Sequence, residues 1–411
     1  MPSTEPKSDA SNRRRTRPAW LLFTTLGVTV LACGVGLWQF MQPNLPSGVT
    51  QARFDAAAQQ FQELHGTGGS HVEIVLLIGE LAVAEERLEE ARACFQAIPS
   101  SDSRYGPAAR LQQAQVALRL NRAREAEANF REFLALAARR TDTDSTHLNV
   151  ARKWLAYILS VELRIEERQV VLAELHASGQ ADVYDSKQLY LPHLLIWPSP
   201  VGRRKLEAFL QQDAEDPMLL VAWGRYLTAE GKPEEARVLL SQLCRQDPKN
   251  LQCTAALLEA MYEQNDWDGF AKLYKSVLPY RDFEPWLLSR LRGQYALHQK
   301  DWEQAVLEFQ HVLAADPADP GAHVGLAKAF AALGRDVERD RLLQQSAVLA
   351  KMRVSLVGVN EQDAHAATAL AEQCEEVGLE TAARVFRMHA SRLAQSRPHS
   401  APVESDARAA L

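Results

Sequence analysis

The pattern of apolar and polar positions divides the chain into one long apolar run and a series of amphipathic segments. The run is residues 19–41, AWLLFTTLGVTVLACGVGLWQFM, and it contains no charged residue. From about residue 50 onward, apolar side chains recur every three or four positions, as they do on one face of a helix. Residues 51–65 begin this pattern, with Phe54, Phe61 and Leu64 on one face. The pattern predicts an all-helical protein behind a single apolar segment.

The apolar run has the length and the flanking residues of a transmembrane helix. About 20 residues are enough to cross ~30 Å of hydrocarbon. Trp20 and Trp38 lie near its two ends, where aromatic side chains prefer the membrane interface. Four arginines lie within residues 13–17, and the next basic residue after the run is Arg53. The positive-inside rule then predicts a single-pass anchor in a cell inner membrane, with the C-terminal domain outside the cytoplasm, in the periplasm.

Two kinds of processing are alternatives to a permanent anchor. The stretch VLAC, residues 30–33, resembles a bacterial lipoprotein box in which Cys33 would carry the lipid. Leu31 fits that box poorly, and the apolar run continues beyond the cysteine. A cleaved signal peptide would have a shorter apolar region, of about 7–15 residues. We therefore predict an anchor and keep lipidation of Cys33 as the alternative.

Small and bulky residues recur at a fixed spacing through much of the remaining chain. Two small residues twelve positions apart are followed four positions later by a bulky one, as in Gly224, Ala236 and Leu240. Antiparallel helices approach closely only where both present small side chains, and a large residue one turn on fills the remaining groove. The other sets are Gly79–Ala91–Phe95, Ala114–Ala126–Phe130, Gly293–Ala305–Phe309 and, with a departure at its third member, Ala371–Ala383–Arg387.

Helix-capping residues follow the same period. Asp247-Pro248 and Asp316-Pro317 lie eleven to twelve residues beyond the second small residue. Aspartate accepts hydrogen bonds from the free N–H groups of a new helix, and proline is harmless in its first turn. Gly231 falls where the turn between the two helices needs a residue that tolerates left-handed backbone.

This combination resembles the tetratricopeptide repeat family, whose unit is a helix–turn–helix of 34 residues. The resemblance implies an all-α fold, a right-handed superhelix of such repeats behind the N-terminal transmembrane helix. At this period the units begin near residues 72, 107, 217, 251, 286, 320 and 364. The unit at 251 departs, with Leu258 and Phe270 at the small positions, and the unit at 320 has Arg339 opposite Ala327.

The same patterns predict the domain organisation. Residues 141–216 keep helical spacing but lose the repeat signature, and the composition after residue 395 is typical of a disordered tail. The expected segments are a basic cytoplasmic tail (1–18), the transmembrane helix (19–41), a linker with a short helix (42–70), repeats (71–140), degenerate helical repeats (141–216), repeats (217–395) and the tail (396–411).

The resemblance also implies a concave groove, lined by the first helix of each repeat, that binds a peptide or a helix of a partner. Tyr262 is the expected aromatic anchor in this groove. For each of these residues, a solvated polar surface is the alternative interpretation. The predicted groove residues are Arg225, Glu259, Tyr262, Arg290, Gln294, His298 and Lys328.

Composition and charge narrow the function classes. The chain has 411 residues and a net charge of −6, and its basic excess is confined to residues 1–18, so the remainder is acidic. This distribution argues against nucleic acid as the main partner. No metalloprotease, nucleophile-elbow, phosphate-loop or C-x-x-C motif occurs. We expect no enzyme, no metal site and no cofactor. The cysteines are expected to be free thiols, although Cys244 and Cys253 could meet across a helix boundary.

The sequence thus predicts a membrane-anchored scaffold for protein–protein interaction, serving bacterial envelope assembly or secretion. Its partners are proteins or peptides, and residues 19–41 contact the membrane. Two alternatives remain open: an assembly lipoprotein anchored through Cys33, and an assembly factor for a redox complex.

Overall fold

A computed structural model describes residues 45–140, 144–193, 199–275, 285–356 and 363–396 of the chain. The described residues from 46 to 396 form one compact unit. Among the helices described, none is both long enough and apolar enough to cross a bilayer. The predicted cytoplasmic tail and transmembrane helix lie outside the described residues, as do residues 397–411 of the predicted C-terminal tail.

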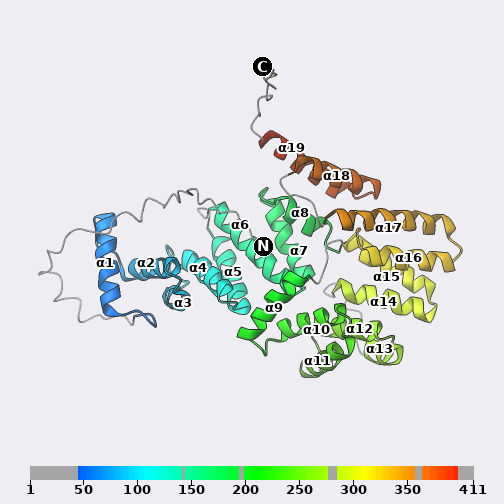
Figure 1. The fold of residues 1–411 in the computed structure, drawn as a ribbon, viewed down its shortest axis with the longest axis horizontal. Coiled ribbons are helices and arrows are strands. Elements are labelled where there is room, and N and C mark those ends of the chain that lie inside the picture. The colour runs from blue at the N-terminus through cyan, green and yellow to red at the C-terminus, as the bar shows by residue number, and fades with distance from the viewer. Residues whose placement is uncertain (1–44, 141–143, 194–198, 276–284, 357–362, 397–411) are drawn as a thin grey trace, which may run out of the picture. The chain divides into compact units, whose positions relative to one another are not determined.

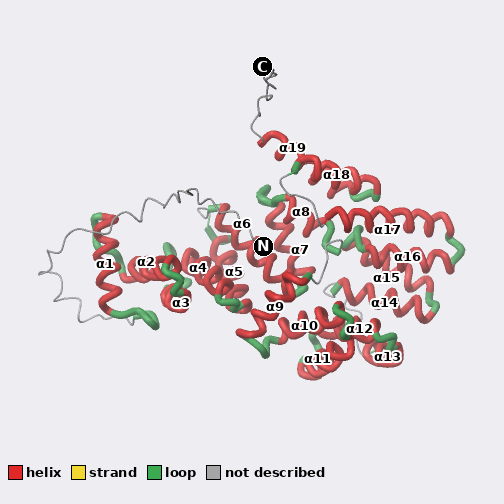
Figure 2. The backbone as a smooth tube through the Cα atoms, in the orientation of Figure 1, coloured by secondary structure: helices red, strands yellow, loops and turns green. Residues whose placement is uncertain are grey.

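All regular structure within the described residues is helical (Figures 1 and 2). It therefore confirms an all-α solenoid of short helices. In chain order the helices are α1 (Gln51–His65), α2 (His71–Ala84), α3 (Leu88–Ala97), α4 (Gly106–Arg119), α5 (Ala123–Ala137), α6 (Ser145–Val161), α7 (Ile165–Ala177), α8 (Val183–Tyr190), α9 (Pro200–Gln212), α10 (Pro217–Ala229), α11 (Pro233–Gln246), α12 (Leu251–Glu263), α13 (Trp267–Tyr274), α14 (Trp286–Gln299), α15 (Trp302–Ala315), α16 (Pro320–Ala332), α17 (Asp336–Leu356), α18 (Ala364–Glu376) and α19 (Glu380–Ser396).

Within the described ranges, eight pairs of consecutive helices are joined by the same backbone turn. In each turn one residue has positive φ; at Gly231, as the sequence predicts, φ is 76°. The N–H of the residue with positive φ donates a hydrogen bond to the carbonyl three residues before it. The N–H of the following residue donates to a carbonyl five residues before its own position. This pair of bonds closes the end of the first helix in a Schellman motif. The turn residues are Glu86, Asn121, Leu163, Gly231, Asn265, Lys300, Gly334 and Gly378.

The small and bulky residues of the repeat meet as their spacing predicts. A Cβ built on Gly224 would lie 2.7 Å from the side chain of Leu240, and one built on Gly293 would lie 2.8 Å from the ring of Phe309. The bulky residue of the second helix therefore lies directly on the backbone of the first. Ala236, the second small residue, is fully buried. The α10–α11 and α14–α15 hairpins owe their close packing to this contact.

The segment with no repeat signature, residues 141–216, also contains a hairpin of the repeat type. Helices α6 and α7 are joined through Leu163 by the same Schellman turn as the other pairs. The left-handed residue here is a buried leucine, not glycine or asparagine, and for this reason the sequence pattern did not reveal it. Helices α8 and α9 follow.

The cysteines differ from expectation at one pair. Cys244 and Cys253 form a disulfide between α11 and α12, with their Cα atoms 5.8 Å apart. The prediction of free thiols is therefore wrong for this pair. The last turn of α11 and the first turn of α12 lie on either side of a short connection, which brings the two residues together. Cys94 and Cys374 are free and buried.

Replacing Ala236 by leucine tests the close packing of the hairpins. The larger side chain has no space at this fully buried position, so overpacking should lower the free energy of unfolding by roughly 1–3 kcal/mol. Ala229→Leu is the control, because Ala229 is exposed at the end of α10. Chemical denaturation followed by circular dichroism measures both variants. Equal losses from the two would show that the wrong face has been assigned to the interior.

Candidate interaction surface

The first helices of the C-terminal repeats bring three of the predicted groove residues together. Arg225 on α10 contacts Glu259 on α12, with Nε 3.1 Å from Oε2. The other oxygen of Glu259 lies 3.7 Å from Arg290 on α14. One carboxylate thus joins two guanidinium groups across three successive repeats. These three residues lie on a common face.

The series continues to the N-cap of α16. Arg290 Nη1 lies 3.6 Å from Oδ2 of Asp319, a carboxylate that is almost fully buried. Burial alone would raise the pKa of Asp319, but the charges of Arg290 and His193 and two backbone N–H groups outweigh it, and the pKa lies below its usual value. We call Arg225, Glu259, Arg290 and Asp319 the charge ladder.

The chain itself covers this ladder with residues 163–193. The carbonyl of Leu163 accepts a hydrogen bond from Arg225 Nη1 at 3.1 Å. The carboxylate of Glu166 accepts one from the backbone N–H of Trp286 at 2.8 Å and a longer one from Gln252 at 3.4 Å. These contacts attach the start of α7 to α10, α12 and α14 in turn.

The end of the same segment is attached to the last of these first helices. His193 Nδ1 lies 2.6 Å from Oδ2 of Asp316, just before α16. Val183 and Leu191 share an apolar cluster with Ala318 and with residues of α17–α19. In Figure 1, α7 and α8 accordingly lie between α6 and α14–α17. We call residues 163–193 the covering segment.

The prediction that the groove residues are exposed is therefore wrong for part of the set. The side chains of Arg225 and Glu259 are 18% and 19% exposed. The two are paired with each other, and Arg225 also contacts the covering segment through the carbonyl of Leu163. Lys328 and His298 are exposed, and Gln294 is half-buried. The predicted groove is a common face, but its central charges already have partners within the chain.

Tyr262, the predicted aromatic anchor, belongs to an aromatic cluster at one end of α12 and α14. Its ring meets Trp267 edge to face at 5.7 Å, and the His298 ring stacks on the same indole at 4.1 Å. Tyr295 adds a further ring 6.2 Å from Trp267. Tyr262 is half-buried in this cluster. Sequence reasoning missed Trp267, although its place directly after an N-cap aspartate, Asp266, marks the start of a helix.

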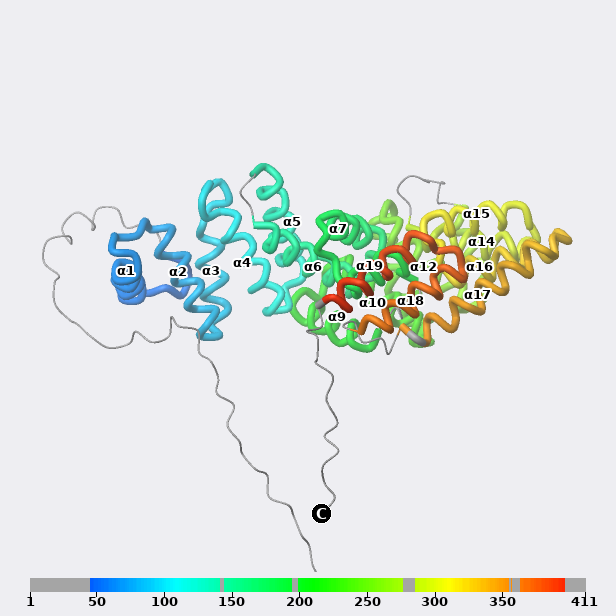
Figure 3. Tube along the Cα trace, turned by 90° about the horizontal axis from the view of Figure 1, so that it is seen from above, coloured from blue at the N-terminus to red at the C-terminus, as the bar shows by residue number. Residues whose placement is uncertain are grey.

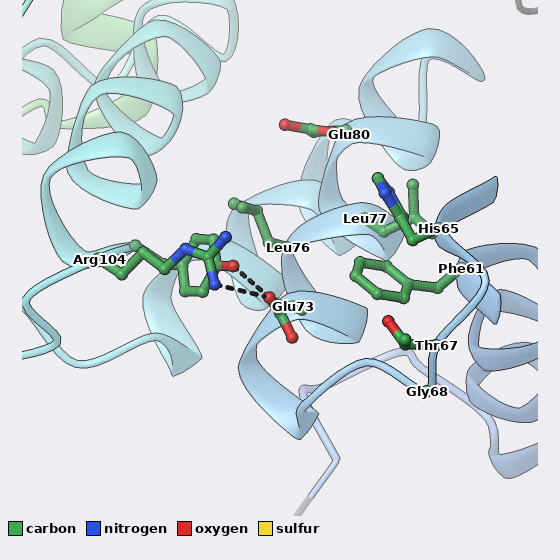
Figure 4. A pocket seen from close by; sticks show the side chains of 10 residues that line it. Phe61, His65, Thr67, Gly68, Glu73, Leu76, Leu77, Glu80 and Arg104 are labelled. Atoms are coloured by element: carbon green, nitrogen blue, oxygen red, sulfur yellow. Dashed lines mark hydrogen bonds and ion pairs between the residues drawn. The ribbon is translucent and has the colours of Figure 1, made fainter.

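A second surface lies at the N-terminal repeats, where the structure has a pocket of about 400 Å³ (Figure 4). Glu73, Leu76, Leu77 and Glu80 line it from one face of α2, since residues three, four and seven apart share a helix face. Phe61 and His65 of α1, the following loop, and Arg104 and Tyr105 just before α4 complete it. Figure 3 shows α1, α2 and α4 in succession along the chain.

The local sequence explains how this pocket is formed. Gly66 ends α1 in left-handed backbone at φ 71°, and Ser70 begins α2 with a capping box to Glu73. The glycine-rich loop between them therefore provides the C-cap of α1 and the N-cap of α2. It lacks the lysine of a phosphate loop. Phe61 packs on the backbone of Gly69, where a Cβ would lie 2.8 Å from the ring.

One carboxylate of the pocket is strongly held. The hydroxyl of Tyr105 donates a hydrogen bond to Glu73, Arg104 lies 3.3 Å away, and the N–H of Ser70 donates at 2.8 Å. The hydrogen bond from Tyr105, followed by those from Ser70, lowers the pKa of Glu73 to about 2. Glu73 is therefore ionised at neutral pH.

The other carboxylate, Glu80, has a different environment. Its side chain lies at the far end of the pocket from that of Glu73, and Glu80 is an exposed residue (Figure 4). Partial removal of water by its neighbours raises the pKa of Glu80. Of the arginines, lysines and histidines in the described ranges, none is within ion-pair distance of it. Sequence reasoning missed this pair of glutamates, although their spacing of seven on a helix placed them on one face.

In the part of the chain that the structure describes, two further clusters have residue types used in metal binding or catalysis. His193, Asp316 and Asp319 offer ligand atoms within 4.8 Å of one another. His193 is already hydrogen-bonded to Asp316, however, and Arg290 neutralises Asp319. Ser186 and His389 are 2.9 Å apart but buried between α8 and α19, where no substrate can reach the hydroxyl. We interpret both clusters as internal pairing that attaches the covering segment to its neighbours.

Comparison with known proteins identifies the repeats. Models of the tetratricopeptide repeat family match residues 49–105, 227–289 and 290–339. The chain therefore contains tetratricopeptide repeats on both sides of residues 141–216. No curated protein matches it.

Similar solved structures are distant from this chain. MamA 41-end from Desulfovibrio magneticus RS-1 shows 18% identity over 44% of this chain and 97% of its own, with a TM-score of 0.28. A tetratricopeptide repeat protein from Parabacteroides merdae ATCC 43184 shows 13% identity over 64% of this chain and 100% of its own, with a TM-score of 0.31. The human IFIT1 dimer with m7Gppp-AAAA shows 12% identity over 84% and 96%, with a TM-score of 0.36.

Arg290→Ala tests whether the charge ladder contributes to stability. The change leaves the buried carboxylate of Asp319 without its guanidinium, and a buried charge that loses its partner is costly. We expect the free energy of unfolding to fall by about 1–3 kcal/mol. Lys328→Ala, at an exposed position of α16, should change it by no more than about 0.5 kcal/mol. Urea denaturation compares the two, and similar small effects would mean that the ladder is only a surface feature.

Glu162 gives a test by pH at the turn that begins the covering segment. Burial raises its pKa to about 7, despite the nearby Arg164, from a usual value of 4.5. Between these pH values the folded protein keeps a proton that the unfolded chain releases, so this group makes stability fall as the pH rises. Glu162→Gln should remove that part of the pH dependence. The measurement is the difference in unfolding free energy between wild type and variant from pH 4.5 to pH 7; a constant difference would contradict the assignment.

Proposed function

We propose that this tetratricopeptide-repeat chain is a protein-interaction scaffold that holds partner proteins on the first-helix face of its N-terminal repeats. The observation that carries the proposal is the contrast between its two faces. The C-terminal face pairs its central charges internally and is covered by residues 163–193. The N-terminal face has an open pocket on α2 with a carboxylate, Glu80, that has no ion-pair partner among the described residues.

We further propose that the scaffold is anchored in a membrane by residues 19–41, with its repeats outside the cytoplasm. The uncharged run and the arginines before it support this topology. The disulfide between Cys244 and Cys253 agrees with it, because such bonds persist in oxidising compartments and are rare in the cytosol. A role in bacterial envelope assembly or secretion extends the proposal by analogy of layout.

Site-specific photo-cross-linking in native membranes tests the proposed face. Ala108 is exposed on α4 and lies 35 residues after Glu73, the same interval that separates the turn residues Glu86 and Asn121. A photoreactive residue at position 108 should cross-link partner proteins. The control is Val238 on α11, a second helix of a repeat, whose side chain is 73% exposed.

The yields at the two positions decide the outcome. Cross-linked proteins from position 108 well in excess of those from position 238 would support the scaffold. Equal yields, or none from position 108, would overturn it. Recovery of the chain from the soluble fraction of the same cells would refute the anchor and leave the interaction face to be judged separately.

A further inference from the structure

We infer that the pocket between α1, α2 and the start of α4 binds a basic side chain, lysine or arginine, of the partner protein. The inference rests on the proposed scaffold function and adds the chemistry that its N-terminal face recognises. It is drawn from three features of the pocket: two carboxylates on one helix face, walls suited to a long cationic side chain, and an internal guanidinium already bound in this way.

The carboxylates give the pocket its charge preference. Glu73 and Glu80 project from the same face of α2 at opposite ends of the cavity (Figure 4). Glu73 is fixed by Tyr105 and Ser70, so its position and its charge are set before any ligand arrives. Glu80 has no cation within ion-pair distance in the described part of the chain. A ligand that brings a positive charge to Glu80 supplies a partner that the fold does not provide.

The walls between the carboxylates suit the stem of such a side chain. Phe61, Leu76 and Leu77 contribute apolar surface, and Tyr105 contributes an aromatic ring. Lysine and arginine carry three or four methylene groups that bury well against apolar surface while the charged end reaches a polar group. A cavity of about 400 Å³ accommodates one such side chain and part of its backbone.

Arg104 shows the binding mode within the protein itself. Its guanidinium lies 3.3 Å from Glu73 and 5.0 Å from the centre of the Tyr105 ring. A carboxylate together with an aromatic face is the combination that binds guanidinium groups in proteins. The Arg104 side chain is 77% exposed, so it lies at the rim of the pocket and can rotate away at little cost. Arg104 is therefore an internal competitor for Glu73, whereas Glu80 at the other end of the pocket is open to a basic residue of the partner.

A bare metal ion fits the pocket less well than a side chain. Calcium prefers six or more oxygen ligands and magnesium a near-ideal octahedron, whereas the pocket has two carboxylates at its two ends, one of them already hydrogen-bonded. An anionic lipid headgroup would be repelled by both glutamates. The charge of the site selects a cation, and its apolar walls select one with a hydrocarbon stem.

The experiment uses the full chain in detergent micelles and a defined probe. The probe is a fluorescent, end-blocked nonapeptide of alanine and serine with one central arginine. Its counterpart carries citrulline, which has nearly the same shape but no charge. Titration at low ionic strength, followed by fluorescence anisotropy, should show the citrulline peptide binding about fivefold more weakly or worse, since a charge-assisted hydrogen bond is worth more than about 1 kcal/mol.

Three variants locate the binding. Glu80→Gln should weaken binding of the arginine peptide about fivefold, whereas Arg104→Ala should strengthen it by removing the internal competitor. Glu63→Gln is the matched control, because Glu63 is exposed on α1 and does not line the pocket. All three positions are exposed, so circular-dichroism melts should match that of the wild type.

Equal binding of the arginine and citrulline peptides would overturn the inference, as would equal losses from Glu80→Gln and Glu63→Gln. The cross-linking experiment separates this result from a failure of the scaffold. Cross-links from position 108 that persist without any preference for arginine would leave the scaffold standing and refute the pocket. Binding of arginine that depends on Glu80, without cross-links from position 108, would support the pocket and refute the scaffold.

Discussion

The left-handed residue that closes each helix hairpin is the constraint on which the rest of the structure depends. Because every turn has the same length and the same pair of hydrogen bonds, the second helix always returns in the same register. That register places Leu240 on Gly224 and Phe309 on Gly293. Glycine meets the requirement without strain, whereas Leu163 and Lys300 adopt a conformation that costs L-residues roughly 1–2 kcal/mol. Leu163 is buried and its carbonyl is bound by Arg225, and these contacts offset that strain.

The repeat period also explains the charge ladder. Residues about one repeat apart occupy equivalent positions on neighbouring first helices, so opposite charges at such positions meet across the solenoid. Arg225 and Glu259 are separated by 34 residues and are in contact. The α6–α7 turn then presents the carbonyl of Leu163 to the same arginine, so the geometry that closes this hairpin also begins the covering segment. The sequence pattern leaves the face that carries Arg225 and Glu259 open to solvent, whereas in the structure this face is an internal interface.

The parts of the fold that depend on local pattern could be predicted from the sequence, and the parts that depend on distant pairing could not. The spacing of Gly224, Ala236 and Leu240 encodes a hairpin within 17 residues, and Gly231 marks its turn. The α6–α7 hairpin could not be recognised from the sequence, because leucine at position 163 has none of the preference for left-handed backbone that glycine and asparagine have. The contacts of Glu166 with Trp286 and of His193 with Asp316 join residues more than 100 positions apart, and no periodicity specifies them. The anchor and the termini remain predictions, because they lie outside the described residues.

The two first-helix faces differ in what a ligand would have to displace. On the C-terminal face it would have to remove the covering segment, which would leave Asp316 without its histidine and the start of α14 without Glu166. It would also expose Val183 and Leu191, which pack with Ala318. Losing these hydrogen bonds and this apolar burial costs on the order of 3–5 kcal/mol. On the N-terminal face it would have to move only the exposed Arg104, whose ion pair with Glu73 is worth about 1 kcal/mol or less. The difference favours binding at the N-terminal repeats, even though the repeat signature is strongest in the C-terminal ones.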